Sequence, residues 1–270
     1  MFSFSKYSGL GNDFIFIDDR SLAFPIDQEI IQNMCHRKLG IGSDGLVLVQ
    51  KSQKADILMR IFNSDGNEAE MCGNALRCLY LFLEEIGFSS TSYLIETYER
   101  LLRISKEGDK VLCEMGEPKI LKIDQKLSLG NQTFVGHFVN TGVPHFVIFV
   151  DDLKKVDVEN LGRVLSFNPY FGLARSNINF VRICNDCLEI RTYERGVEEE
   201  TLACGTGAAA AAVVAHLTHK IPSPIEVQTK LGSTLKFNFD MLGGNIQNIN
   251  MIGDASYVFK GFFSLKKVLK

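Results

Sequence analysis

The sequence predicts an α+β fold of two similar lobes, each a mainly antiparallel sheet wrapped around one central helix, with the active site in the cleft between the lobes. Three observations support this prediction: an internal repeat, a predominance of short strand patterns, and one apolar helix in each copy. The chain of 270 residues, 46% of them hydrophobic, is long enough for two domains of about 130 residues, each with its own core.

The repeat is clearest at residues 9–19 and 142–152, which share a glycine, an apolar run and an Asp-Asp pair at an offset of 133 residues. Further matches follow in the same order, pairing Ser43-Asp44 with Ser176-Asn177 and Cys72 with Cys204. Ordered matches at a nearly constant offset indicate a duplicated unit, rather than the βα patterns that recur in any mixed protein.

A turn signal at Gly116-Glu-Pro118 separates the two copies. We expect an N-terminal lobe over residues 1–115, a C-terminal lobe over 116–251, and a return of 252–270 to the N-terminal lobe. Strand patterns lie at Phe14–Asp18, Leu46–Gln50, Ile57–Phe62, Leu101–Ser105 and Lys110–Met115 in the first copy, and at Phe146–Val150, Ile178–Ile183, Leu188–Tyr193 and Leu235–Phe239 in the second.

One conspicuous helix follows a Cys-Gly pair in each copy. The first helix has apolar residues at helical spacing, namely Ala75, Leu76, Leu79, Leu83 and Ile86. Gly87 ends this helix. The second, Ala208–Val214, is apolar on every face, so we expect a sheet to wrap around it and bury it on all sides.

The composition excludes several classes of protein. The balance of 29 Lys and Arg against 32 Asp and Glu argues against a nucleic-acid-binding protein held by phosphate contacts. No apolar run reaches about 18 residues, which argues against a membrane span, and the first residues lack the features of a signal peptide. Seven cysteines without such a signal indicate a reducing cytoplasm. The oligomeric state is left open, with a homodimer as one option.

Cys72 and Cys204 stand at the N-termini of the two predicted helices. Backbone N–H groups and the helix dipole there favour a thiolate, and they also suit an anion such as a carboxylate. A single cysteine is more often a small buried apolar residue, but that interpretation weakens for two cysteines at equivalent places in a duplicated chain. Two thiols that flank one carbon can invert its configuration, because one removes a proton and the other delivers a proton to the opposite face.

The motifs around these cysteines resemble those of the diaminopimelate epimerase family, and the resemblance covers nearly the whole chain. The matching segments are Lys6-Tyr-Ser-Gly-Leu-Gly-Asn-Asp-Phe14, Gly40-Ile-Gly-Ser-Asp-Gly45, Phe62-Asn-Ser-Asp-Gly66, Met71-Cys-Gly-Asn74, Tyr193-Glu-Arg-Gly196 and Ala203-Cys-Gly-Thr-Gly207. The resemblance implies a cofactor-independent isomerase that interconverts LL- and meso-diaminopimelate, a small amino-acid substrate, in lysine and peptidoglycan synthesis.

The resemblance also implies roles for individual residues. Cys72 and Cys204 match the acid/base pair, and His145 and Glu194 match polar neighbours that tune the two thiols without a metal. The positions that hold the polar groups of the substrate are Asn12, Asn63, Asn177, Glu194 and Arg195. The loops that cradle the reacting α-carboxylate are Gly73-Asn74 and Gly205-Thr206.

Two positions depart from the family pattern, because Val143 stands where many members have Asn and Gly45 where many have Gln. Val143 removes polar atoms from the expected distal recognition site. A broader amino-acid racemase that also accepts glutamate is therefore one alternative, and a non-catalytic thiol-switch or binding protein is another. Cys184 and Cys187 form a Cys-x-x-Cys without further ligands for a zinc site, and we interpret this segment as a turn.

Overall fold

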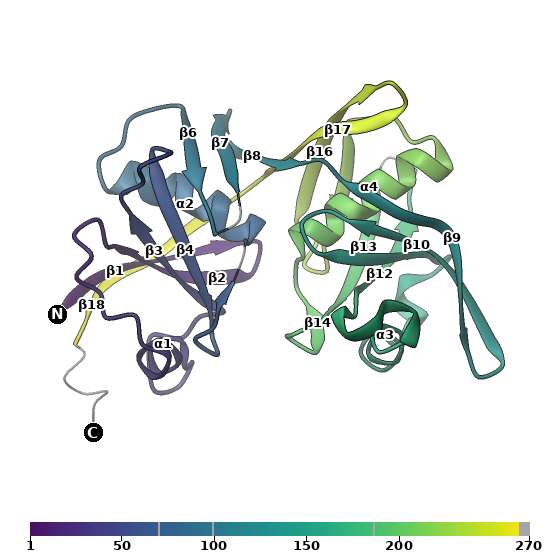
Figure 1. The fold of residues 1–270 in the computed structure, drawn as a ribbon, viewed down its shortest axis with the longest axis horizontal. Coiled ribbons are helices and arrows are strands. Elements are labelled where there is room, and N and C mark those ends of the chain that lie inside the picture. Colours follow the sequence, from purple (N-terminus) through teal and green to yellow (C-terminus); the bar gives the residue numbers. More distant parts are fainter. Residues whose placement is uncertain (70, 99, 186, 265–270) are drawn as a thin grey trace. The chain divides into compact units, whose positions relative to one another are not determined.

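Figure 1 shows the fold in a computed structural model, which describes residues 1–69, 71–98, 100–185 and 187–264. The chain divides into two compact units. Unit 1 comprises Met1–Cys113 and the segment that begins at Gly253, and unit 2 comprises Glu114–Ile252. The last residues of the expected return segment, 265–270, lie outside the described residues.

Unit 1 is built on strands that pair mainly antiparallel, with two helices. Its strands are β1 (Phe2–Gly9), β2 (Asn12–Asp18), β3 (Gly45–Gln50), β4 (Ile57–Asn63), β5 (Glu68–Ala69), β6 (Ser92–Glu96), β7 (Leu101–Glu107), β8 (Lys110–Gly116) and β18 (Ser256–Phe263), and its helices are α1 (Gln28–Cys35) and α2 (Gly73–Glu85). The pairs β18–β1, β1–β2, β3–β4, β4–β5, β6–β7 and β7–β8 are antiparallel, whereas β2–β3 and β4–β6 are parallel. The chain passes from unit 1 to unit 2 within β8.

Unit 2 repeats this pattern. Its strands are β9 (Lys119–Leu129), β10 (Gln132–Asn140), β11 (Pro144–Phe149), β12 (Asn177–Ile183), β13 (Leu188–Glu194), β14 (Glu199–Thr201), β15 (Ile225–Gln228), β16 (Thr234–Leu242) and β17 (Asn245–Gly253). Its α-helices are α3 (Val158–Ser166) and α4 (Gly205–His219), with 3₁₀ turns at Leu153–Lys155 and Pro169–Ala174. Antiparallel and parallel pairs follow one another in the same order as in unit 1. The antiparallel pairs are β9–β10, β10–β11, β12–β13, β13–β14, β15–β16 and β16–β17, and the parallel pairs are β11–β12 and β13–β15. The predicted duplicated α+β fold is therefore confirmed.

The two main helices begin where the sequence predicts, directly after the cysteines. Helix α2 packs on β1, β2 and β7, and its leucines Leu76, Leu79 and Leu83 are fully buried. Helix α4 lies against β10–β13, β15 and β16, and every residue from Gly207 to Ala215 is buried. Because alanine makes up most of this buried segment, the strands can approach it closely from several sides. The prediction that this helix is buried all round is confirmed.

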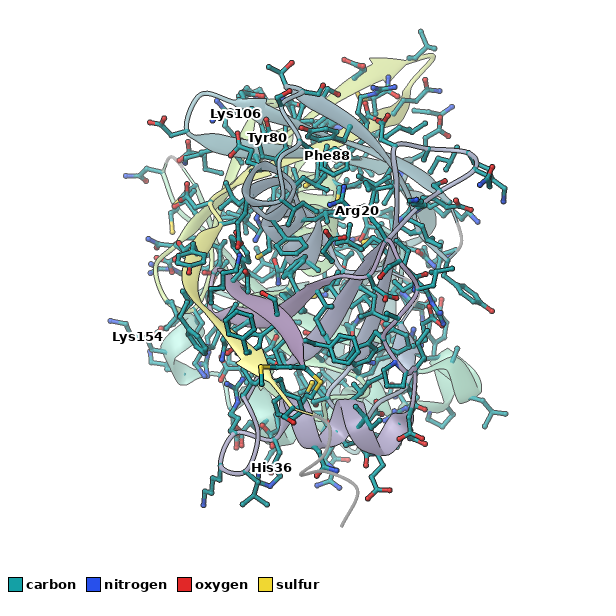
Figure 2. The ribbon with its side chains drawn as sticks, turned by 90° about the vertical axis from the view of Figure 1, so that its left-hand side faces the viewer. Arg20, His36, Tyr80, Phe88, Lys106 and Lys154 are labelled. Atoms are coloured by element: carbon teal, nitrogen blue, oxygen red, sulfur yellow. The ribbon has the colours of Figure 1, made fainter. Side chains whose placement is uncertain are left out.

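The C-terminal end of α2 illustrates how a short loop is secured. Gly87 follows the helix with a φ of +94°, a conformation that side chains disfavour. The next residue, Phe88, places its ring 5.2 Å from the guanidinium carbon of Arg20, which lies in the turn after β2 (Figure 2). This cation–π contact ties the loop back to the sheet.

The other cysteines lie in buried elements or in the turn between β12 and β13. Cys35 ends α1, Cys78 lies in α2 and Cys113 in β8, and all three are buried. Cys184 donates its backbone N–H to the carbonyl of Cys187 at 2.8 Å, which closes a turn between β12 and β13. In the described part of the chain, no group of His, Cys, Asp and Glu has a geometry that could hold a metal ion. Nor does any helix in those residues have the length and apolarity to cross a membrane.

Candidate active site

Cys72 and Cys204 occupy the same backbone position in the two units, the residue that precedes the first helical turn. Both have extended backbones, with φ and ψ of −141° and 117° at Cys72 and −121° and 105° at Cys204. Neither cysteine side chain caps its own helix. The first N–H groups of a helix lack acceptors within the helix, so each cysteine stands beside donors suited to an anion.

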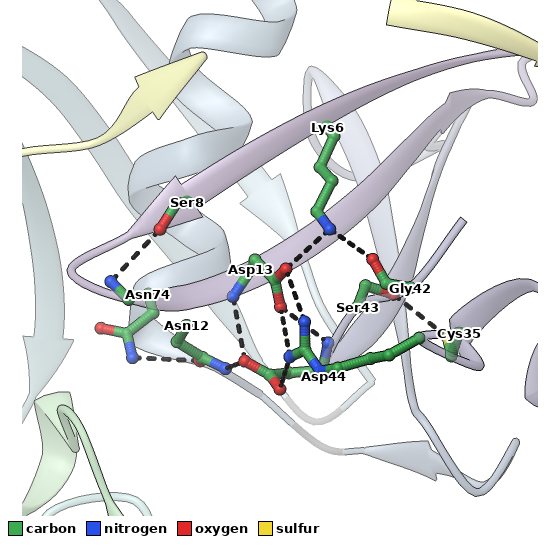
Figure 3. Close-up of polar contacts among 11 residues, drawn as sticks. Lys6, Ser8, Asn12, Asp13, Cys35, Gly42, Ser43, Asp44 and Asn74 are labelled. Carbon is green, nitrogen blue, oxygen red and sulfur yellow. Dashed lines mark hydrogen bonds and ion pairs between the residues drawn. The ribbon is translucent and has the colours of Figure 1, made fainter. Parts of the chain in front are cut away.

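The first cysteine site consists of Cys72, Asn12, Asp44 and Asn74, of which Figure 3 labels Asn12, Asp44 and Asn74. The thiol of Cys72 lies 3.7 Å from Oδ1 of Asn12, and Nδ2 of Asn74 donates to the same oxygen at 3.1 Å. Nδ2 of Asn12 donates to Oδ2 of Asp44 at 2.8 Å. Because the Asp44 carboxylate accepts from the Asn12 amide, it fixes the orientation in which the amide oxygen faces the thiol.

Charged residues behind Asn12 hold this arrangement in place. Arg37 contacts the carboxylates of both Asp13, at 2.9 Å, and Asp44, at 2.5 Å, and Nζ of Lys6 lies 2.7 Å from Asp13. Burial alone raises the pKa of Asp13, but hydrogen bonds and charges from Arg37 and Lys6 outweigh burial and lower that pKa to about 2. The first site is therefore organised by ionised groups.

Asn74 is fixed from its other side by Arg77, one turn further along α2. NH2 of Arg77 donates to Oδ1 of Asn74 at 2.8 Å, and its Nε donates to the backbone carbonyl of Asp254 at 3.1 Å. Arg77 is fully buried, and burial lowers its pKa from the usual value. The guanidinium thus sets the orientation of the amide that reaches Asn12.

The second cysteine site consists of Cys204, His145, Asn179 and Thr206. Oγ1 of Thr206 lies 3.5 Å from the Cys204 sulfur and 2.9 Å from Nε2 of His145. Nδ1 of His145 lies 3.1 Å from Nδ2 of Asn179. A second threonine, Thr141, donates from its hydroxyl to the backbone carbonyl of Thr206 at 2.7 Å and holds the first turn of α4.

His145 is a neutral imidazole in this site. Its side chain is completely buried, and burial together with the charge of Arg195 lowers its pKa to about 3. The second site is therefore organised by neutral and largely buried groups, in contrast to the first.

Gly207 is required by the close packing of the second site. A Cβ atom at this position would lie 2.4 Å from Oδ1 of Asn179 and 3.3 Å from the Cys204 sulfur. The equivalent residue of α2, three positions after Cys72, is Ala75. Only the second helix therefore needs a glycine at this position.

The other residues expected to bind substrate fall into two groups. In unit 2, the backbone N–H of Arg195 donates to Oδ1 of the buried Asn177 at 2.9 Å, so these two residues are held together. Glu194 accepts a hydrogen bond from the hydroxyl of Thr201 at 3.0 Å. In unit 1, Asn63 ends β4 with an exposed side chain, and its backbone bonds to the turn that follows.

Sequence reasoning missed three residues that orient these sites, namely Asp44, Arg77 and Asn179. Arg77 and Asn179 each place a polar group in a buried segment, where polar groups require partners, whereas Asp44 is half-buried. Asn179 in particular lies between Ile178 and Phe180 in a strand whose neighbours are buried. A polar residue within an apolar strand pattern is thus the feature of the sequence that indicates Asn179.

The two departures from the family pattern occupy different environments. A Cβ at Gly45 would lie 2.6 Å from the backbone carbonyl of Phe62 in the neighbouring strand β4, so the position has no room for a longer side chain without a backbone shift. Val143 lies half-buried in the turn before β11, and its carbonyl accepts from the backbone N–H of Thr141 at 3.3 Å.

Comparison with known proteins identifies the family to which the chain belongs. Curated diaminopimelate epimerases from Aquifex aeolicus and Archaeoglobus fulgidus are each 37% identical to the chain, over 97% and 98% of both sequences, respectively. Solved structures with the same fold include a PhzF-family protein from Bacillus anthracis (17% identity, TM-score 0.75, 96% of this chain and 98% of that chain) and a probable proline racemase from Agrobacterium radiobacter K84 (14%, 0.77, 98% and 93%). The sequence model of the family described as diaminopimelate epimerase matches residues 4–121 and 137–258. The chain therefore belongs to the diaminopimelate epimerase family.

Proposed function

We propose that this isomerase interconverts LL- and meso-diaminopimelate without a cofactor, with Cys72 and Cys204 as the acid/base pair. The observation that carries the proposal is the equivalent placement of the two cysteines at helix N-termini in a duplicated fold. Family membership supports the reaction and the substrate.

In the proposed reaction, the thiolate of one cysteine removes the proton from the α-carbon of the substrate. The carbanion spreads its charge onto the α-carboxylate, and N–H donors at Gly73-Asn74 and Gly205-Thr206 stabilise that charge. The thiol of the other cysteine then delivers its proton to the opposite face of the carbon. The first cysteine ends as a thiol and the second as a thiolate, so protons and charge balance.

The remaining polar side chains hold the substrate in this proposal. Arg195 suits a carboxylate because its guanidinium can bind both oxygens, and its own backbone is anchored by Asn177. Asn12, Asn63 and Glu194 complete the set of groups for the polar ends of the substrate. His145 acts on the Cys204 side through Thr206.

The decisive experiment measures α-proton exchange in deuterated water for LL- and meso-diaminopimelate separately. Cys72→Ser and Cys204→Ser should each reduce epimerisation by about 10²- to 10⁴-fold, because a serine hydroxyl is a far weaker acid than a thiol. Each variant can retain slow exchange with one diastereomer, on the face that keeps its cysteine. The control Cys184→Ser changes a half-buried thiol in the turn between β12 and β13 and should leave the rate unchanged.

The same assay decides between the proposed function and its alternatives. Parallel measurement with L-glutamate tests a broader racemase, the candidate that the apolar Val143 favours. No exchange with glutamate, at enzyme concentrations where diaminopimelate exchanges fully, excludes that candidate. If both Cys→Ser variants epimerise at the parental rate, the two-cysteine mechanism is wrong and a thiol-switch or binding role gains support.

We also propose that the enzyme is a cytoplasmic homodimer. The mechanism requires two reduced thiols, which a reducing compartment maintains. Strand β18 exposes the apolar side chains of Tyr257, Val258, Phe259 and Phe262, and grouped exposed apolar side chains are typical of a protein–protein contact surface. Sedimentation equilibrium of the full chain and of Phe262→Asp tests the dimer; a monomeric parental chain would contradict it.

A further inference from the structure

Asn179, His145 and Thr192 form a buried polar cluster across three neighbouring strands of unit 2. Asn179 in β12 lies directly opposite Thr192 in β13 and is the register partner of Val147 in β11. Asn179 and His145 are fully buried, and Thr192 is nearly so. Buried polar atoms in such a position are held in one arrangement by their partners.

The contacts of the Asn179 amide define which end is oxygen and which is nitrogen. Oδ1 accepts from the hydroxyl of Thr192 at 3.0 Å, and Nδ2 lies 3.1 Å from Nδ1 of His145. Nδ2 also lies 3.4 Å from the backbone carbonyl of Phe146, a group that can only accept. The reversed amide would set two oxygens against each other, so the Phe146 carbonyl excludes it.

The orientation of the amide determines where the imidazole carries its proton. Because Nδ2 of Asn179 donates to Nδ1 of His145, that nitrogen has no proton, and in a neutral ring the proton is on Nε2. Nε2–H then donates to Oγ1 of Thr206 at 2.9 Å. The hydroxyl oxygen is thereby used as an acceptor, and its own proton is directed away from the ring, toward the Cys204 sulfur at 3.5 Å.

We propose that Asn179 is a positioning residue that holds His145 in the Nε2–H tautomer and thereby directs the Thr206 hydroxyl proton toward the Cys204 thiolate. The inference rests on the proposed function for its catalytic consequence, but the tautomer can be observed without any activity. In this arrangement His145 donates a hydrogen bond toward the cysteine and does not remove its proton.

The substitution Asn179→Asp tests the inference because it preserves the shape of the side chain and reverses its polarity. A carboxylate beside Nδ1 draws the imidazole proton to that nitrogen, so Nε2 becomes an acceptor for the Thr206 hydroxyl. Cys204 then loses its donor. We expect kcat for diaminopimelate to fall about 10- to 100-fold with little change in KM, because the lost interaction acts on the reacting thiol.

The direct readout is the long-range proton–nitrogen NMR spectrum of the full chain labelled with ¹⁵N-histidine, in which His145→Gln identifies the His145 signals among the five histidines. The parental protein should show a proton on Nε2 at neutral pH, and Asn179→Asp should move it to Nδ1. Two control variants accompany this measurement. Thr192→Val removes only the hydroxyl that donates to Oδ1 of Asn179, and Asn185→Asp makes the same amide-to-carboxylate change at an exposed position. Both controls should keep the Nε2–H signature.

Each outcome decides the inference. A proton on Nδ1 in the parental protein overturns it, even if Asn179→Asp does not fold. An unchanged tautomer and unchanged kcat in a folded Asn179→Asp also overturn it. If the tautomer moves as expected while neither protein epimerises diaminopimelate, the positioning role stands and the proposed function is what has failed.

Discussion

The two cysteine sites share one backbone and differ in the groups that hold their side chains. In each, a residue at the start of a strand contacts the side chain two positions after the cysteine: Asn12 contacts Asn74, and His145 contacts Thr206. Asn12 is oriented by the carboxyl group of Asp44, which pairs with Arg37, whereas His145 is oriented by the neutral amide of Asn179. Duplication has preserved the helix N-terminus and the strand pairing, while the polar partners have diverged.

This divergence changes the atom that faces each sulfur. Oδ1 of Asn12 can only accept, so its contact favours a thiol at Cys72. The hydroxyl of Thr206 can donate, so its contact favours a thiolate at Cys204. A two-base inversion starts with one cysteine as a thiolate, which removes a proton, and the other as a thiol, which delivers one. The comparison thus suggests why a duplicated enzyme benefits from unequal halves.

The largest expected difference between the sites is their response to acid. The pKa of His145 is lowered by burial to about 3, so between about pH 6.5 and pH 3 the unfolded chain binds a proton at this residue and the folded chain does not. Stability should therefore fall as the pH falls through this window, by roughly 5 kcal/mol in all. Asp13 acts in a lower window: its lowered pKa makes stability fall only between about pH 4 and pH 2, by at most about 2 kcal/mol.

Urea unfolding between pH 7 and pH 4.5 checks this order. His145→Asn should flatten the loss of stability over that range, because asparagine does not titrate, whereas Asp13→Asn should leave the slope close to that of the parental protein. Equal slopes for the parental protein and His145→Asn would show that the second site is not protected from protons as its burial requires.

Most of the regular structure around these sites could be predicted from the sequence, for identifiable reasons. Strands such as β2 and β3 have long buried apolar runs, and α4 is apolar on all faces, so each shows a clear pattern. The exposed strand β9 has no such pattern, and β18 depends on pairing with β1 at the opposite end of the sequence. Neither could be recognised from local residues alone.

Some residues of the candidate site could likewise be predicted from the sequence, and others could not. Cys72 and Cys204 were found because duplication repeats their motifs. Asp44, Arg77 and Asn179 act through partners that only the folded strands and helices bring near, so no spacing in the sequence indicates them. The polar interruption of the β12 pattern at Asn179 could have marked a buried hydrogen bond, but it could not have identified His145 as the partner.

Gly207→Ala should produce the next largest effect and should separate the two helices. Its Cβ would displace Asn179 or the Cys204 side chain, at a cost of about 1–3 kcal/mol in stability together with a marked loss of kcat. In a helix without such a collision, the same change would stabilise the protein by about 1 kcal/mol.

The reverse exchange at the equivalent position of α2 is Ala75→Gly. It should lower the stability by about 1 kcal/mol through helix propensity, plus a smaller packing loss, and should change kcat less. Thermal unfolding and epimerase assays of both variants test this contrast; a stabilised and active Gly207→Ala would contradict the close packing of the second site.

Arg37→Gln should have the smallest effect, because the ionised network of the first site is partly open to solvent. The Arg37 side chain is 57% exposed, and exposed ion pairs contribute about 1 kcal/mol or less and weaken with salt. Asp44 still accepts from Asn12 without it, so we expect a modest change in epimerase activity. The sensitive measurement is the pKa of Asp13, followed by carboxyl NMR, which should rise from about 2 toward its ordinary value when one of its two cationic partners is removed. If Arg37→Gln instead destabilises the protein as strongly as Gly207→Ala, the charged first site is as tightly constrained as the neutral second one, and the contrast between the two sites must be abandoned.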